Sequence, residues 1–241
     1  MEKMFNGATK TGEIVTQFPR ASQILKEYRL DFCCGGNRPI REAIAEKNLN
    51  EEEVLSRLNT LYVETKELNE REVNWELERY SSLIDHILTT HHAYLDNVLT
   101  ELNAFVTKVY RVHGMKHPEL SQVYSLFRRL KLELEDHLIQ EEEKVFPKIK
   151  AYEEDQSQDS LKKVLETIAA LEQDHEEAGN LLKELRTVTD DYTLPEGACT
   201  TYTLMYLKLE ELESDLFQHI HLENNILFPR LERERANVHY S

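Results

Sequence analysis

Two stretches of the sequence, HLIQEEEKVFP at residues 137–147 and HIHLENNILFP at residues 219–229, repeat one pattern. In each, a histidine is followed four residues later by glutamate and nine residues later by Phe-Pro. His137 and Glu141 therefore correspond to His219 and Glu223, at an offset of 82 residues. A four-residue step places both side chains on one face of an α-helix. The pattern predicts two helices that each direct an imidazole and a carboxylate to the same side.

Histidines also interrupt two further apolar helical stripes. His92 and His175 each lie between leucines at helical spacing, and each is followed five residues later by an asparagine, at an offset of 83 residues. The first two stripes of the chain thus correspond to the last two. If the halves fold together, a pseudo-two-fold axis would relate them.

Four long helical segments are expected at about residues 79–111, 118–151, 158–188 and 196–233. The chain has only seven glycines and six prolines, and the breaks between these segments are short. Short connections between long helices favour an antiparallel arrangement. The predicted fold class is all-α, with an antiparallel four-helix bundle in residues 79–241.

A small helical domain is expected in residues 1–60. Pro19 suits the first turn of one helix, and Asn50 with Glu53 forms the capping pattern of another. Between them, the glycines of Asp-Phe-Cys-Cys-Gly-Gly at residues 31–36 break the helical pattern. Residues 61–78 are polar and weakly periodic, which indicates a partly helical linker.

The composition restricts the partners. The chain has 29 lysines and arginines and 45 aspartates and glutamates, so its net charge is −16. A surface with this charge repels nucleic acid and anionic membrane surfaces. Three cysteines do not make a secreted disulfide framework, and no apolar stretch resembles a signal peptide or a membrane span. We expect a cytoplasmic protein with no nucleic-acid or membrane partner.

Six polar side chains would converge in the core of the bundle: His92, His137, Glu141, His175, His219 and Glu223. A single core histidine is usually satisfied by a hydrogen bond, but an ionised carboxylate buried without a partner costs on the order of several kcal/mol. A bound cation relieves that cost and accepts imidazole lone pairs. Nitrogen and oxygen donors without thiolate suit iron or manganese, and zinc less distinctively.

The pattern therefore predicts two metal ions bridged by the glutamates, with iron as the preferred metal. Six protein ligands do not saturate two octahedral ions. Oxo or hydroxo bridges and exogenous small molecules would fill the remaining positions.

The adjacent thiols of Cys33 and Cys34 form a second candidate site. Thiols just before a helix are expected to have a lowered pKa, and thiolates bind soft metals and react with oxidants and nitric oxide-derived species. The alternative is a small buried pair beside a Gly-Gly turn. Cys199 is expected to pack in the core. His86 is expected to point away from the ligands and His113 to lie in a loop, with proton transfer near the metal site as the alternative for both.

The sequence resembles the bacterial iron–sulfur cluster repair di-iron proteins, also called the repair-of-iron-centres family, from about residue 11 to 230. The motifs that carry this resemblance are Asp31-Phe32-Cys33-Cys34-Gly35-Gly36, Leu83-Ile84-Asp85-His86 with His92, His137-x-x-x-Glu141-Glu142, Asp174-His175-x-x-Ala178-Gly179, Pro195-Glu196-Gly197-Ala198-Cys199 and His219-Ile220-His221-Leu222-Glu223-Asn224-Asn225.

The resemblance implies a Cys-Cys-Gly-Gly domain followed by a hemerythrin-like bundle with a non-haem di-iron centre. It places the ligands at the six residues already selected and a thiol pair of less settled role at Cys33 and Cys34. Oxygen-carrying hemerythrins have a further histidine one turn after the ligand of the third helix, where this chain has Gly179. A more open and labile centre is therefore expected.

The implied function is repair of iron–sulfur clusters after oxidative or nitrosative stress, by iron donation, by processing of nitric oxide, or by both. Damaged iron–sulfur proteins would be the partners, nitric oxide or dioxygen the small ligands, and a homodimer is compatible with the sequence. Whether the chain is an enzyme stays open. One alternative is a hemerythrin-like oxygen or redox sensor, and another is a structural bundle that needs no metal.

Overall fold

The computed structural model describes residues 4–69 and 73–238, with no side chains described at 67, 69 and 236–238. Within these residues the regular structure is helical apart from one isolated bridge between Lys10 and Pro39. The predicted all-α class is confirmed. The chain divides into two compact units, Met1–Arg79 with Ile220–Ser241, and Tyr80–His219. The domain boundaries drawn from the sequence, at residues 60 and 79, stay a prediction.

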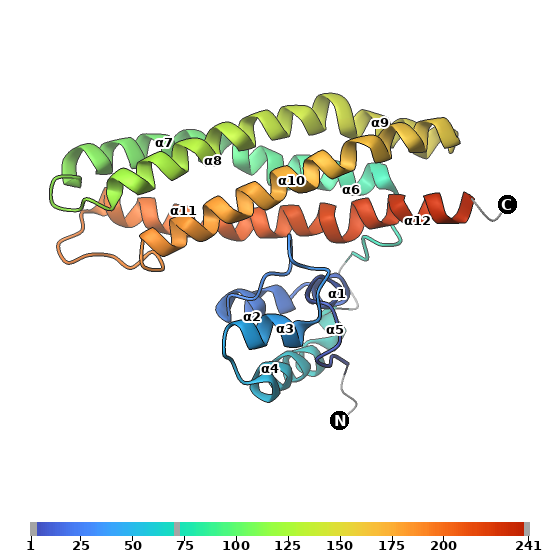
Figure 1. Cartoon of the computed structure of the whole chain (residues 1–241), viewed down its shortest axis with the longest axis horizontal. Helices are drawn as coiled ribbons and strands as arrows, with labels where there is room; N and C mark the ends of the chain where they lie inside the picture. Colours follow the sequence, from blue (N-terminus) through green and yellow to red (C-terminus); the bar gives the residue numbers. More distant parts are fainter. Residues whose placement is uncertain (1–3, 70–72, 239–241) are drawn as a thin grey trace. The chain divides into compact units, whose positions relative to one another are not determined.

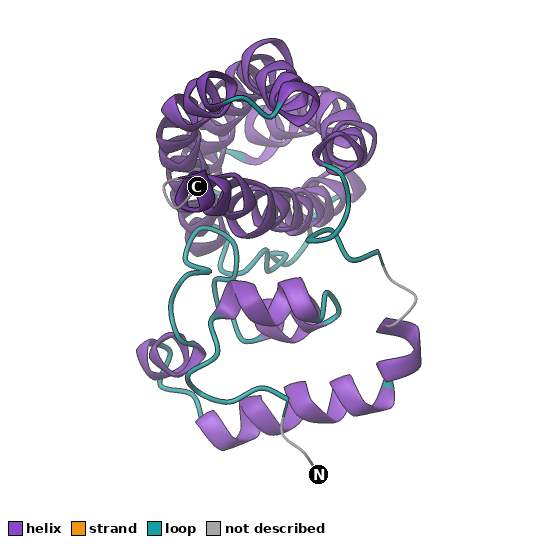
Figure 2. Cartoon of the chain, turned by 90° about the vertical axis from the view of Figure 1, so that its right-hand side faces the viewer, coloured by secondary structure: helices purple, strands orange, loops and turns teal. Residues whose placement is uncertain are grey.

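The second unit is built on four long helical rods, which can be followed in Figure 1. The first comprises α6 (Tyr80–Ile87), η1 (Leu88–His92) and α7 (Ala93–His113), and the second α8 (Leu120–Gln140), η2 (Glu141–Val145) and α9 (Phe146–Asp155). The third is α10 (Gln158–Val188), and the fourth begins with α11 (Thr200–Leu222). Helix α8 packs against α7 and α10, and α6 packs against α9. Figure 2 looks along these rods.

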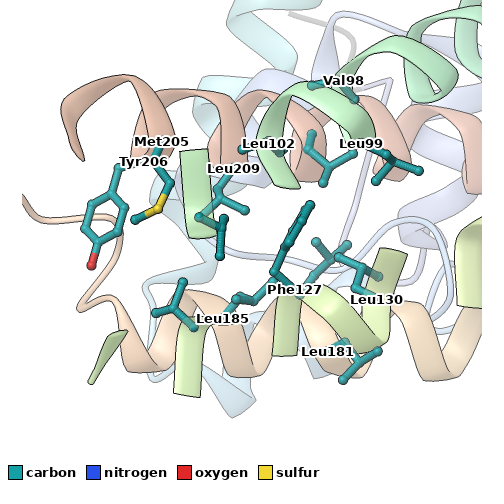
Figure 3. Packing of buried hydrophobic residues seen from close by; sticks show 14 of the residues in the cluster. Val98, Leu99, Leu102, Phe127, Leu130, Leu181, Leu185, Met205, Tyr206 and Leu209 are labelled. Atoms are coloured by element: carbon teal, nitrogen blue, oxygen red, sulfur yellow. The ribbon is translucent and has the colours of Figure 1, made fainter. Parts of the chain in front are cut away.

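Leucines at helical spacing from all four rods form the apolar core. Phe127 of α8 is fully buried and lies among leucines of α7, α8, α10 and α11 (Figure 3). Burying one such side chain stabilises the fold by about 1.5–3 kcal/mol. The predicted stripes therefore face the core, and the turns that carry the polar candidates continue the same faces.

Three short turns of the described chain are π-helical rather than α-helical: η1, η2 and η3 (Glu223–Leu227), the last continuing α11 into α12 (Phe228–Val238). The amide that closes each turn bonds to the carbonyl five residues earlier, as from Phe146 to Glu141. Pro147 and Pro229 follow two of these turns directly after the phenylalanine. A proline lacks an N–H and crowds the carbonyl four residues earlier, and a wider turn before it relieves that clash.

In the described residues 4–69, the first unit contains five helices: α1 (Thr11–Gln17), α2 (Ala21–Glu27), α3 (Ile40–Glu46), α4 (Glu51–Glu64) and α5 (Lys66–Asn69). The unit also includes η3 and α12. The Asn50 side chain accepts hydrogen bonds from the amides of Glu52 and Glu53, so α4 begins where the capping pattern predicts. The rings of Phe5, Phe18 and Tyr62 pack together, with centroids 5.4–6.3 Å apart. Helix α1 also packs against η3.

No helix in the described part of the chain is both long enough and apolar enough to cross a membrane.

An ion pair between α10 and α11 provides a test of the packing. Arg186 Nε lies 3.0 Å from both carboxylate oxygens of Glu213, which is 4% exposed, and Arg186 Nη1 lies 2.9 Å from Asp191. Replacing Arg186 by Met leaves a buried charge without its main partner, so we expect a loss of about 3 kcal/mol in the free energy of unfolding. Denaturant titration with circular dichroism measures it.

The matched control is Arg129→Met. Arg129 pairs with Glu133 at 2.7 Å on an exposed helix face, where such pairs contribute about 1 kcal/mol or less. If Arg186→Met and Arg129→Met lowered the free energy of unfolding equally, the buried pair of Arg186 and Glu213 would contribute no more to stability than an exposed pair.

Candidate metal centre

All six residues selected from the sequence are buried, with exposed fractions of 4% or less, and Glu141 and Glu223 are 0% exposed. His92 ends the π turn η1, whereas Glu141 begins η2 and Glu223 begins η3. The remaining histidines lie in regular helices: His137 in α8, His175 in α10 and His219 in α11. Each rod thus supplies an imidazole, and two supply a carboxylate one turn later.

The Glu141 carboxylate lies between imidazoles from different helices. Its Oε2 is 3.3 Å from Nε2 of His92 and 4.0 Å from Nε2 of His219, and its Oε1 is 3.2 Å from Nε2 of His137. The rings of His92 and His219 meet edge to face, with centroids 5.0 Å apart. A single carboxylate therefore reaches toward histidines on both sides of it.

His137 and His175 face each other through their Nε2 atoms, which are 3.0 Å apart. Without a cation, one of these nitrogens must carry a proton for the contact to be favourable. With a cation, both nitrogens could direct their lone pairs to it. The pair is therefore chemically suited to hold one metal ion.

Two groups of side chains have ligand atoms within 4.8 Å of one another: His92, Glu141, His219 and Glu223, and His137, Glu141, His175 and Glu223. Each group contains two histidines, and both contain the same two glutamates. Burying two carboxylates is costly unless positive charge accompanies them. The donor set of nitrogen and oxygen atoms, in a site without exposure to water, therefore fits two adjacent cations.

Two outer carboxylates fix the histidine tautomers. Nδ1 of His92 lies 2.8 Å from Oε1 of Glu142, and Nδ1 of His137 lies 3.3 Å from Oδ2 of Asp174. Because a carboxylate accepts, each Nδ1 carries the proton, and the Nε2 lone pair is available in the interior. The sequence analysis gave Glu142 and Asp174 no role of their own, although each directly adjoins a predicted ligand.

Neighbouring histidines surround the centre without joining either group. His91 is buried, lies parallel to the His219 ring at 5.5 Å and contacts Asp215 through Nδ1 at 2.9 Å. The His86 ring is 5.9 Å from His91, and burial lowers the pKa of His86. His113 ends α7, about 30 Å along the helix from His92. The alternative in which His113 carries protons near the metal site is therefore wrong.

The cysteines correct two further predictions. Contact with the Cys34 sulfur and burial raise the pKa of Cys33 well above its usual value, where we predicted a lowered pKa. Helix α3 begins only at Ile40, too far along the chain for its N-terminus to favour a thiolate. Cys199 was expected in the core, but it is exposed and its Sγ lies 3.2 Å from Nε2 of His113.

The outer carboxylates can be tested separately from the ligands. Replacing Glu142 or Asp174 by Ala removes the acceptor that orients His92 or His137, so we expect metal affinity to fall about tenfold or more. Competition with a chelator of known affinity measures the change.

Glu143→Ala is the matched control, since Glu143 is exposed on the same turn as Glu142. Equal affinities of all three variants and the parent chain would show that the outer contacts do not tune the centre.

Two family models match separate segments of this chain. Residues 83–231 match the Hemerythrin HHE cation binding domain, and residues 7–62 match ScdA_N, a Domain of Unknown function (DUF542). The iron-sulfur cluster repair protein ScdA of Staphylococcus epidermidis is 34% identical over 220 residues, which cover 91% of this chain and 96% of that protein.

Two further relatives cover a similar share. A probable iron-sulfur cluster repair protein of Haemophilus influenzae is 35% identical over 226 residues, 94% of this chain and 97% of the relative. The iron-sulfur cluster repair protein YtfE of Escherichia coli O157:H7 is 36% identical over 219 residues, 91% of this chain and 94% of the relative. The similarity therefore extends over both the N-terminal segment and the bundle.

Proposed function

This chain belongs to the family of iron–sulfur cluster repair proteins, and we propose that it restores clusters damaged by oxidative or nitrosative stress. The observation that carries the proposal is the pair of buried His/Glu groups that share Glu141 and Glu223. Relatives of nearly the same length bear the repair name. Damaged iron–sulfur proteins are accordingly the proposed partners.

His92 and His219 would hold one non-haem iron and His137 and His175 the other, and both groups would include Glu141 and Glu223. When bound, the two irons supply a redox-active centre with positions for nitric oxide or dioxygen. The imidazoles and carboxylates hold these ions in place, and the outer carboxylates keep the proton on Nδ1 of His92 and His137.

The ligand count favours a labile centre. One turn after His175, α10 carries Gly179, which is buried and offers no side-chain donor. Six protein ligands for two ions leave several positions to exogenous groups. This arrangement supports iron donation, in which iron is the cargo, or nitric oxide processing. The repair reading is favoured over the alternative of an oxygen or redox sensor because the relatives are named for repair.

The shared carboxylates provide the first test. Glu141→Leu or Glu223→Leu should abolish binding of two irons while the helical fold persists, because exchanging a buried carboxylate for an apolar residue need not destabilise the metal-free protein. Metal analysis of anaerobically purified protein, Mössbauer spectroscopy and circular dichroism measure iron content, its state and the fold. Glu143→Leu is the matched exposed control, and full iron content in both ligand variants would refute the assignment.

The second test concerns repair itself. The iron-loaded protein is incubated with an iron–sulfur enzyme whose cluster has been damaged by peroxide or nitric oxide, and recovery of that enzyme is followed. We expect recovery with the parent chain and with Glu143→Leu, but not with Glu141→Leu. Recovery that is equal with and without the iron-loaded chain would refute the proposed function.

A further inference from the structure

Asn225 of η3 is bound to the backbone around Cys33. Its Nδ2 donates to the carbonyl of Cys33 at 3.0 Å and to that of Phe32 at 3.3 Å. The ring of His221 lies against the same segment, with Nδ1 3.3 Å from the Phe32 carbonyl. Two side chains of the segment that includes Glu223 therefore contact the carbonyl groups beside the cysteine pair.

Two glycines leave the space that the Asn225 carboxamide occupies. A Cβ atom at Gly12 would lie 2.2 Å from Oδ1 of Asn225, and one at Gly36 would lie 2.3 Å from the same atom. The two glycine backbones are joined to each other, because Gly12 N donates to Gly36 O at 2.9 Å. The backbone on both sides of the carboxamide is therefore fitted to this one side chain.

The two thiols beside this contact lie close together and differ in their exposure to solvent. Sγ of Cys33 lies 3.8 Å from Sγ of Cys34, and Cys33 is 3% exposed whereas Cys34 is partly exposed. The peptide group that joins them carries the Cys33 carbonyl, which is the acceptor for Asn225. Closing a bond between adjacent sulfurs makes a small ring that contains this peptide, and the peptide is stiff. We expect the carbonyl to change direction when the ring closes, because the sulfurs must approach from 3.8 Å to a bond of about 2.05 Å.

We propose that Cys33 and Cys34 form a reversible vicinal disulfide and that Asn225 links the oxidation state of this thiol pair to η3. The oxidant is a low-molecular-weight disulfide. The Cys34 thiolate, on the accessible side, attacks one of its sulfurs, forming a mixed disulfide and releasing one thiolate. The Cys33 thiol then loses its proton and attacks the Cys34 sulfur, releasing the second thiolate. Two electrons pass to the external disulfide, which leaves as two thiols.

The linkage has a defined direction. Asn225 stabilises the reduced pair through the Cys33 carbonyl, so ring closure weakens that bond and loosens η3. Reciprocally, removing the carboxamide favours the disulfide. Glu223 lies two residues before Asn225 on the same π turn, so the thiol state acts on the segment that supplies a shared carboxylate.

The first experiment uses the full metal-free chain in mixtures of reduced and oxidised glutathione, followed by alkylation and mass spectrometry. We expect the peptide containing Cys33 and Cys34 to lose two hydrogens and to carry no glutathione. Cys33→Ser should keep glutathione on Cys34, and the exposed Cys199 serves as an internal control for mixed-disulfide formation. Two alkylated cysteines, or glutathione on each, would overturn the proposal.

The second experiment measures the linkage. Asn225→Ala should shift the equilibrium about tenfold toward the disulfide, which corresponds to about 30 mV for a two-electron couple. Asn224→Ala, a neighbouring amide that leaves the Asn225 carboxamide in place, should leave the potential unchanged. Equal potentials for the two variants would overturn the role of Asn225.

Hydrogen exchange of the parent chain gives a measurement that does not depend on a variant. Oxidation should speed amide exchange in η3 and leave α8 unchanged, and identical exchange in both states would overturn the link to η3. Since these readouts need no iron, their failure would leave the repair function standing, and loss of repair would not affect them.

Discussion

The structure depends on placing two carboxylates, Glu141 and Glu223, where water does not reach them. Such burial is tolerable only with compensating positive charge, and imidazoles from all four rods line the same interior. The antiparallel bundle is suited to this, since it brings residues distant in sequence to one depth. The carboxylates on the acidic surface differ from these two, because they are solvated and need no positively charged partner.

The local backbone is adapted to the same constraint. Three of the six polar side chains lie at an end of a π turn, where the helix is wider than an α-helix. Pro147 and Pro229 account for two of these turns, but η1 forms before an alanine, so no proline explains it. Outer carboxylates then hold the proton on Nδ1 of His92 and His137. The backbone and the outer carboxylates thus both orient the ligand atoms toward the interior.

The sequence was sufficient to select the bundle and the six converging residues, because core positions repeat at helical spacing and polar side chains stand out among leucines. The sequence was insufficient where a property depends on contacts between residues that are brought together only by the tertiary fold. The roles of Glu142 and Asp174 were missed because a charged residue beside a ligand resembles an ordinary solvated position. The pKa of Cys33 was predicted in the wrong direction because the contact of its sulfur with Cys34 and its burial depend on tertiary packing.

The same limit explains why Asn225 was quoted only as part of a motif. Its significance lies in Gly12 and Gly36, about 190 to 210 residues earlier, whose missing side chains leave space for its carboxamide. A hydrogen bond from a side chain to a carbonyl contributes only about 1 kcal/mol, too little to hold the fold alone. It is enough to shift the equilibrium between the dithiol and the disulfide of Cys33 and Cys34 measurably. These two states differ only within one small loop, so a change of about 1 kcal/mol in one of them changes their ratio several-fold. A contact of modest strength therefore has more effect on the thiol pair than on stability.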